Sequence, residues 1–223
     1  MSTTIKRFTV AIAMSIAFAS ANAQPAGQQQ QAFNPIKDVV PFSDRDTYLV
    51  QVFFKFSCPV CRAYHLALDN WGKTLPRPFH LEFEPVLEAD ATGQSISLDS
   101  LIGSVMYWSM HDVATPEQMD VFAENAYELV QDDNQGTNPK AWMKAVGESG
   151  VSQKSFTQGF AQERTNRTRA QRQVHYSPTA TPTLVICGKW MITPDSTSGD
   201  QNMFFKLANG LVSKCMVEHG IKG

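Results

Sequence analysis

The segment that most restricts the fold is a strand followed at once by two closely spaced cysteines. Tyr48–Phe56 is dense in β-branched and aromatic residues, a pattern typical of a strand buried on both faces. Cys58-Pro59-Val60-Cys61 follows, and apolar residues then recur at helical spacing as far as Gly72. A proline is favourable in the first helical turn because its missing N–H would have no partner there. The sequence therefore predicts a strand, a turn and an amphipathic helix.

This order places Cys58 at the start of the helix. Free backbone N–H groups and the helix dipole favour a thiolate at that position, so we expect the Cys58 pKa to be lowered. Cys61 lies one turn further along, within reach of Cys58. These positions predict that Cys58 is the nucleophile and that Cys61 is the resolving cysteine, which attacks a mixed disulfide between Cys58 and a substrate.

Two other interpretations of the cysteine pair remain open. It can be a structural disulfide, or half of a zinc site in which His65 is the nearest further ligand. Structural zinc needs four ligands, and the remaining cysteines, Cys187 and Cys215, form no second Cys-x-x-Cys. We favour redox chemistry and expect neither a metal nor another cofactor.

A second motif lies near the carboxyl end. Thr181-Pro182 precedes a segment that reads as two strands turning at Gly188-Lys189. With this motif, 53–61 and 181–189 together resemble the thioredoxin superfamily, and more closely the bacterial DsbA-type thiol oxidoreductases. The resemblance implies an α/β fold, a thioredoxin-like mixed sheet with an inserted all-helical subdomain.

By this resemblance Pro182 is cis and faces Cys58, and the Thr181 backbone pairs with an extended substrate segment. Pro178 is the alternative for the cis position. The thioredoxin-like domain is expected over 35–96 and 175–223, and the helical insertion over 97–174. Further predicted elements are a strand at 79–86, a helix with a capping box from Thr115 to Gln118, and a helix from Asn138.

The site departs from the DsbA pattern at two positions. Val60 stands where those oxidases commonly have histidine, and Val52 stands where they have an acidic residue. Pro59 and Val60 are therefore expected to tune the site. Lys55 either approaches Cys58 or, as we favour, faces solvent. Glu82 and Glu84 are interpreted as exposed strand carboxylates, with a buried proton acceptor for Cys61 as the alternative.

Several remaining polar residues have a less specific pattern. Cys187 and Cys215 are expected to form a structural disulfide, closing a loop that stabilises by roughly 3 kcal/mol, with two separate buried thiols as the alternative. His175 is a candidate for the rim of the site. A solvated helix face is favoured over a basic patch for the arginines Arg164, Arg167, Arg169 and Arg172.

The amino-terminal segment has the composition of an export signal. Residues 1–23 combine Lys6 and Arg7 with an apolar run and Ala21-Asn22-Ala23, which predicts a cleaved signal peptide rather than an uncleaved anchor. The Gln-rich stretch 24–34 is expected to be a disordered leader. Removing 1–23 changes the formal charge from −2 to 17 − 21 = −4, which gives no indication of nucleic-acid binding.

The combined prediction is an exported, periplasmic thiol-disulfide oxidoreductase, most simply a monomeric disulfide oxidase. Its expected substrates are extended segments of thiol-containing exported proteins. The family resemblance implies a membrane DsbB-like redox partner. Alternatives are a disulfide isomerase or reductase, and a noncatalytic peptide-binding chaperone on the same scaffold.

Overall fold

The structure is a computed structural model that describes residues 36–89, 92, 94–163 and 167–221. The predicted signal peptide, 1–23, and the Gln-rich leader, 24–34, lie outside the described residues. No helix in the described ranges is long and apolar enough to cross a membrane.

Five strands form one mixed sheet in the order β1-β5-β4-β2-β3. The central strand β2 pairs parallel to β3 and antiparallel to β4, and β5 pairs antiparallel to both β4 and β1. Every residue of β2 is buried, as the unbroken apolar run predicts. The strands are β1 (Lys37–Asp38), β2 (Leu49–Phe54), β3 (His80–Pro85), β4 (Thr183–Ile186) and β5 (Trp190–Ile192).

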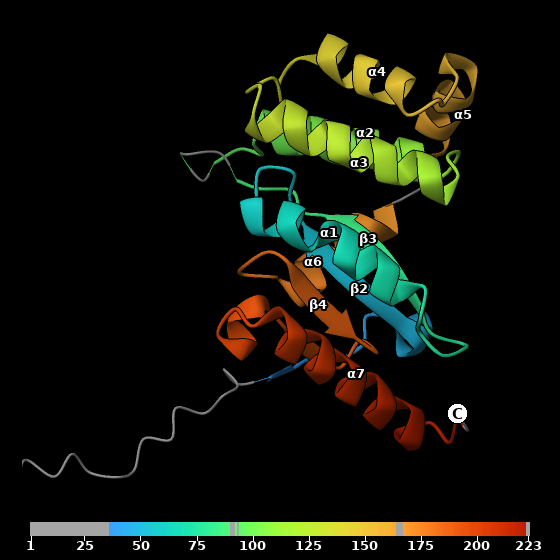
Figure 1. The fold of residues 1–223 in the computed structure, drawn as a ribbon, viewed down its shortest axis with the longest axis vertical. Helices are drawn as coiled ribbons and strands as arrows, with labels where there is room; N and C mark the ends of the chain where they lie inside the picture. The colour runs from blue at the N-terminus through green and yellow to red at the C-terminus, as the bar shows by residue number, and fades with distance from the viewer. Residues whose placement is uncertain (1–35, 90–91, 93, 164–166, 222–223) are drawn as a thin grey trace, which may run out of the picture. The chain divides into compact units, whose positions relative to one another are not determined.

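Helices cover both faces of this sheet (Figure 1). On one face, α1 (Pro59–Gly72) and α7 (Gln201–Glu218) pack against alternate residues of β2 and β4, with Val52, Leu68 and Phe204 in one apolar cluster. On the other face α6 (Arg167–Tyr176) packs through Tyr176 against Phe53. The expected domain boundary at 174/175 thus falls inside a helix that contacts the sheet.

The helical insertion consists of α2 (Leu98–His111), α3 (Pro116–Gln131), α4 (Pro139–Glu148) and α5 (Gln153–Glu163). The predicted capping box is confirmed, because Thr115 and Gln118 exchange side-chain and backbone hydrogen bonds. Phe54 and Phe56, at the carboxyl end of β2, enter the aromatic core of this insertion. The strand that leads to Cys58 is therefore anchored in both parts of the fold.

The contact between α2 and α5 depends on a glycine. A Cβ added at Gly159 would lie 2.0 Å from the Ser109 carbonyl oxygen. Gly159→Ala should therefore destabilise the protein by about 1–3 kcal/mol, because the two helices must separate. Gly147→Ala is the matched control, since nothing lies within 4 Å of its added Cβ and alanine favours a helix by roughly 0.5–1 kcal/mol. Urea unfolding of both variants checks this pair, and equal effects would contradict the close approach.

Candidate active site

Cys58 is the N-cap residue of α1, with Pro59 in the first turn. The Cys61 backbone N–H donates to Cys58 Sγ at 3.2 Å. Neither Cys58 nor Cys61 is bridged in this structure. The sequence prediction of a cysteine at the helix N-terminus is confirmed, and so is the helix end at Gly72.

The surroundings of Cys58 lower the pKa of its thiol from the ordinary 9.0 to about 5. The largest cause is a hydrogen bond from the Cys61 side chain, and the Thr181 side chain and the Val60 and Cys61 backbone amides act in the same direction. Partial burial opposes them but is outweighed. Cys58 is therefore a thiolate at neutral pH, which is the form that reacts with disulfides.

Cys61 has the opposite electrostatic environment. Its side chain is 2% exposed, and burial, followed by the neighbouring Cys58, raises the pKa of its thiol well above the ordinary value. The pair thus contains one reactive thiolate at the surface and one protonated thiol beneath it. This division matches a nucleophile and a resolving cysteine.

The Pro182 loop lies directly beside the cysteines. Cys58 Sγ is 3.3 Å from the Thr181 carbonyl oxygen, and the Thr181–Pro182 peptide bond is cis, whereas the bond before Pro178 is not. The sequence motif therefore identified the correct proline. Arg77–Pro78 is also cis, and no sequence signal distinguished that bond.

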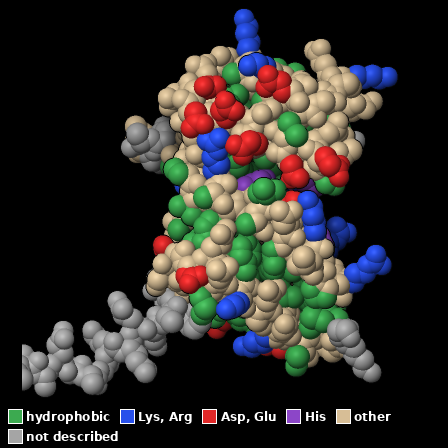
Figure 2. All heavy atoms as spheres, viewed as in Figure 1, with side chains coloured by type: hydrophobic (Ala, Val, Ile, Leu, Met, Phe, Trp, Pro, Cys, Tyr) green, Lys and Arg blue, Asp and Glu red, His purple; other side chains and the backbone are tan. Residues whose placement is uncertain are grey.

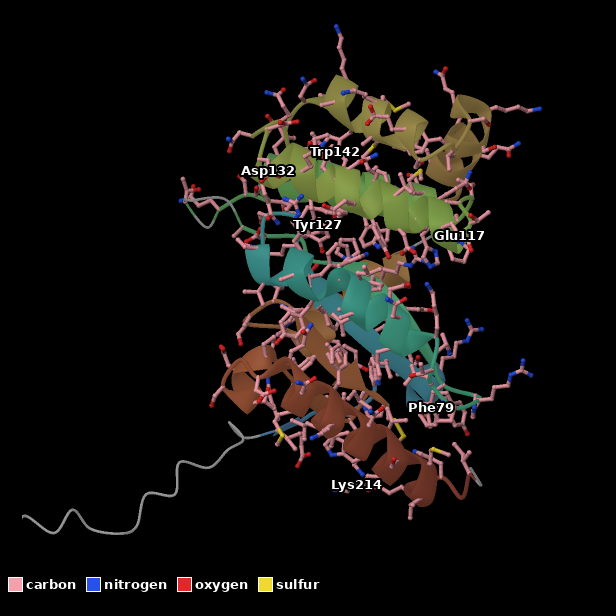
Figure 3. All side chains as sticks on the ribbon, in the orientation of Figure 1. Phe79, Glu117, Tyr127, Asp132, Trp142 and Lys214 are labelled. Carbon is pink, nitrogen blue, oxygen red and sulfur yellow. A yellow bond between two sulfur atoms is a disulfide. The ribbon has the colours of Figure 1, made fainter. Side chains whose placement is uncertain are left out.

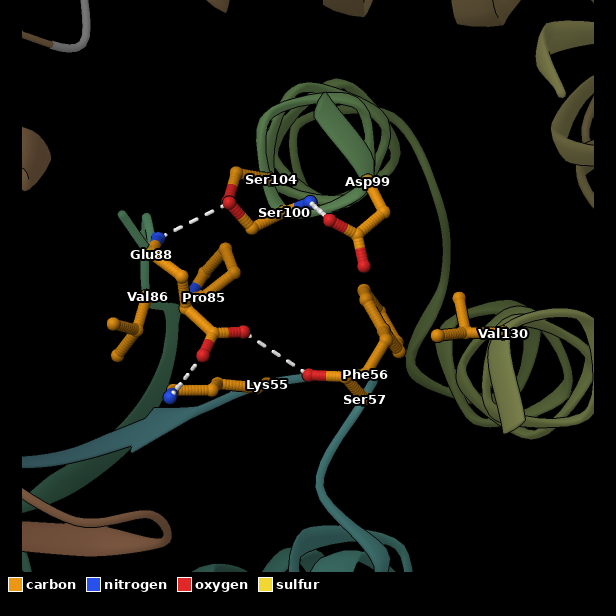
Figure 4. A pocket seen from close by; sticks show the side chains of 10 residues that line it. All are labelled: Lys55, Phe56, Ser57, Pro85, Val86, Glu88, Asp99, Ser100, Ser104 and Val130. Atoms are coloured by element: carbon orange, nitrogen blue, oxygen red, sulfur yellow. Dashed lines mark hydrogen bonds and ion pairs between the residues drawn. The ribbon is translucent and has the colours of Figure 1, made fainter. Parts of the chain in front are cut away.

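An ion pair holds the residues just before Cys58. Lys55 Nζ and Ser57 Oγ both donate to Glu88, at the two oxygens of one carboxylate, and the Glu88 backbone N–H donates to Ser100 Oγ at 3.1 Å (Figure 4). The expectation that Lys55 faces solvent is wrong, because its ammonium is half-buried against Glu88. Glu88 had no motif in the sequence to mark it.

The helical insertion also reaches the site. Gln131, at the end of α3, donates to the carbonyl oxygens of Phe56 and Cys58 at 2.7 and 3.1 Å. Arg62, on α1, pairs with Glu124 on α3 and with Asp132, the C-cap residue of α3. Figure 3 shows Asp132 where α3 ends above the start of α1. These contacts have no signature in the sequence, because a single glutamine or acidic residue on a helix gives no indication of its tertiary partner.

The surface around Cys58 is apolar on one side. Val60, two residues after Cys58, is 44% exposed. Figure 2 shows hydrophobic side chains gathered over the α1 and α7 region, while carboxylates gather over the helical insertion. Val60 thus contributes apolar contact area beside the thiolate and no charge.

The charged residues of α6 and β3 form a buried network away from the cysteines. Arg172 donates to Asp46, Glu82 and Glu84. The expectations of exposed strand carboxylates and a solvated arginine face are therefore wrong for Glu84 and Arg172, which are 2% and 9% exposed. Burial raises the pKa of Glu84 to about 7. The side chains of Arg164 and Arg167 lie outside the described residues, whereas Arg169 pairs with Asp112.

Neither candidate histidine joins the site. His175 contacts the Val40 carbonyl oxygen and the Phe42 ring, so it does not line the rim. His65 stacks on Phe83 with ring centroids 4.4 Å apart, and burial lowers the pKa of its imidazole to about 4. Among the described residues no group of histidine, cysteine and carboxylate side chains is arranged to hold a metal ion.

The second cysteine pair is bridged. Cys187 follows β4, Cys215 lies on α7, and a disulfide joins them. The prediction of a structural disulfide is confirmed over the alternative of two separate thiols. The bridge ties α7 to the sheet next to the Trp190 ring, over which Lys214 Nζ lies 5.1 Å from the centroid.

The sheet order, the Cys-x-x-Cys helix and the facing proline loop define a thioredoxin-like fold with a helical insertion. Solved structures of DsbA proteins have a similar fold. The Pseudomonas aeruginosa DsbA structure superposes with a TM-score of 0.69 at 18% identity, covering 85% of this chain and 95% of that one. The oxidoreductase NmDsbA1 from N. meningitidis gives 0.64 at 18%, covering 86% and 95%, and the Xylella fastidiosa DsbA gives 0.60 at 18%, covering 79% and 90%.

These likenesses confirm the DsbA-type fold predicted from the two motifs. No protein-family model matches the sequence, and no curated protein matches it. The structural similarity is thus much clearer than the similarity in sequence.

Proposed function

We propose that the protein is an exported thiol-disulfide oxidoreductase that exchanges disulfides with substrate proteins through Cys58 and Cys61. The observation that carries the proposal is the placement of Cys58 at the N-cap of α1, 3.3 Å from the carbonyl oxygen of the cis Thr181–Pro182 bond, with the buried Cys61 one turn further along. This placement lowers the Cys58 pKa and raises the Cys61 pKa. A disulfide donor needs this asymmetry. The substrate thiolate attacks Cys58 Sγ of the oxidised pair, the Cys58–Cys61 bond breaks, and Cys61 leaves and takes up a proton.

The second exchange completes the reaction. Another thiolate of the substrate attacks the substrate sulfur of the mixed disulfide, and Cys58 leaves as a thiolate. Two substrate thiols are oxidised and the Cys58–Cys61 pair is reduced. Because a low pKa makes Cys58 a good leaving group, this direction favours a disulfide oxidase over a reductase.

The proposed substrate is an extended segment of a thiol-containing exported protein. Thr181 places its backbone 3.3 Å from Cys58 Sγ, and a hollow of about 230 Å³ adjoins it, lined by 86–89 and 178–181. The exposed Val60, two residues after Cys58, adds apolar contact area. These features support strand-like pairing of an unfolded substrate beside the thiolate.

Regeneration needs an electron acceptor outside this chain. Solved structures with a similar fold include DsbA oxidoreductases, and we propose by that likeness a periplasmic location and a membrane DsbB-like partner that reoxidises the pair. We propose that the protein acts as a monomer.

Oxidation of a reduced peptide with two cysteines tests the proposal. The oxidised protein should form the peptide disulfide stoichiometrically, and Cys58→Ser should lower the rate by at least about 10³-fold, because no other described thiol is free besides the buried Cys61. Cys187→Ser/Cys215→Ser, which removes only the structural bridge, is the control and should retain exchange. Unchanged exchange by Cys58→Ser would exclude the assignment.

The alternatives give different results in the same assay. A noncatalytic chaperone would bind the peptide without changing its thiol content. A reductase would show a reduction potential near the thioredoxin value of about −270 mV and an isomerase one near about −180 mV, whereas an oxidase should lie towards about −120 mV.

A further inference from the structure

Gln131 makes two hydrogen bonds to the turn that carries Cys58. Its Nε2 donates to the Phe56 carbonyl oxygen at 2.7 Å and to the Cys58 carbonyl oxygen at 3.1 Å. A third hydrogen bond, from the Cys58 backbone N–H to the Lys55 carbonyl oxygen at 3.2 Å, closes the same turn. Gln131 therefore spans Ser57 and Cys58, and it holds the Phe56–Ser57 and Cys58–Pro59 peptides.

We propose that Gln131 is a positioning residue for the Cys58 thiolate, through which the helical insertion sets the reactivity of the redox pair. The proposal rests on the proposed function, since it assumes that Cys58 is the nucleophile. Gln131 acts by holding the turn, since its hydrogen bonds go to backbone carbonyl oxygens.

The hydrogen bond from Gln131 to the Phe56 carbonyl oxygen is the more important of the two. This carbonyl group lies beyond the end of β2, where the sheet no longer supplies donors, and Phe56 itself is buried. A buried carbonyl group without a donor destabilises the conformation that leaves it unpaired. Among the described residues the Gln131 amide is its hydrogen-bond donor. Without Gln131, we expect the turn to shift until water or another donor reaches this oxygen.

A shift of the turn changes the environment of the Cys58 sulfur. The backbone nitrogen of Cys61 lies 3.2 Å from Cys58 Sγ. Hydrogen bonds weaken steeply as their distance and angle depart from the optimum. The thiolate is the form that these donors stabilise. Loosening the turn should therefore raise the Cys58 pKa and make the pair a weaker oxidant.

The ion pairs of Arg62 give a matched control. They also join α3 to α1, through Glu124 and Asp132, but they touch no backbone atom of the turn. If Gln131 merely holds α3 against α1, removing these ion pairs should reproduce its effect. If Gln131 positions Cys58, removing them should leave the Cys58 pKa unchanged.

The experiment compares Gln131→Met with Glu124→Gln/Asp132→Asn. Thiolate absorbance against pH gives the Cys58 pKa, and equilibration with glutathione gives the reduction potential. Gln131→Met should raise the pKa by about one unit, the effect expected from one lost hydrogen bond. The glutathione equilibrium should shift about tenfold towards the oxidised protein, or about 30 mV. The control should titrate like the wild-type protein.

Gln131→Glu provides a second test that keeps the side-chain shape. Its carboxylate cannot donate to the two carbonyl groups and adds a negative charge, so the Cys58 pKa should rise further than in Gln131→Met. An unchanged pKa in both variants, or an equal shift in the control, overturns the proposal. A wild-type protein without a lowered Cys58 pKa or without exchange would instead refute the proposed function.

Discussion

The reduced protein should gain stability, relative to a Cys58→Ala variant, as pH rises from about 5 to about 9. The folded-state pKa of Cys58 is about 5, against an ordinary value of 9.0. Between these two values the unfolded chain keeps a thiol proton that the folded protein has lost. A group that binds fewer protons when folded makes stability increase with pH. The gain is thus complete above pH 9 and is lost as pH falls through 5.

The size of this effect follows from the width of the pH window. One pKa unit corresponds to about 1.4 kcal/mol, so the two units between pH 5 and pH 7 set a ceiling of about 2.7 kcal/mol. Because Cys58 is only half-buried, water screens part of this energy, and we expect on the order of 2 kcal/mol at pH 7. Urea unfolding at pH 5, 6, 7 and 8, under a reducing agent, measures the difference.

The oxidised protein is the internal control for this measurement. Its Cys58 is bridged to Cys61 and cannot titrate, so its stability relative to the variant should not follow the same curve. A reduced protein whose advantage over Cys58→Ala stays constant with pH would contradict the lowered pKa. The predicted increase in the stability of the reduced protein would also explain a strong tendency to transfer the disulfide to a substrate. Stabilising the reduced form makes the oxidised form a better oxidant.

The two motifs carried most of what the sequence could predict about this site. Cys58-Pro59-Val60-Cys61 combines a helix-start proline with a preceding buried strand, and these local preferences give the N-cap position of Cys58 without any tertiary information. Pro182 was predicted from its place before a strand, together with the resemblance. Local sequence preferences and the order of the elements along the chain were sufficient to predict the positions of Cys58 and Pro182.

The residues that support the site could not be predicted in this way. Glu88 and Gln131 come from different elements and meet the turn only because β3 and α3 both end beside it. The arginines of α6 fit a solvated helix by spacing alone, yet Arg172 faces a sheet surface that carries Gln51, Glu82 and Glu84. Which polar residues become buried depends on packing between distant segments, and a helical period does not contain that information.

Replacing Arg172, on α6, with methionine should cause a large loss of stability. Its guanidinium lies 3.2 Å from Asp46 Oδ1, 3.3 Å from Glu82 Oε2 and 3.4 Å from Glu84 Oε1. Asp46 is fully buried and Glu84 is nearly so. Removing one partner of a buried ion pair leaves the other charge uncompensated, which typically costs about 3–5 kcal/mol. Methionine keeps most of the apolar volume, so the effect reports on charge.

The pH dependence of the same variant identifies the carboxylate responsible. Burial raises the folded-state pKa of Glu84 to about 7 in the wild-type protein, with Arg172 among the groups that oppose the shift. Without Arg172 this pKa should rise further. A raised carboxyl pKa makes stability fall as pH increases towards the folded-state value, so the deficit of Arg172→Met should widen above pH 7 and stay constant below it.

Arg62→Met is the control that separates a buried network from surface charge. Arg62 also contacts two carboxylates, but Glu124 and Asp132 are 63% and 55% exposed. Exposed ion pairs contribute about 0–1 kcal/mol, so urea unfolding of Arg62→Met should differ from wild type by no more than that. Similar losses in the two variants would mean that water reaches the Arg172 network. A deficit for Arg172→Met several times larger would establish that α6 is fastened to the sheet by charges excluded from water.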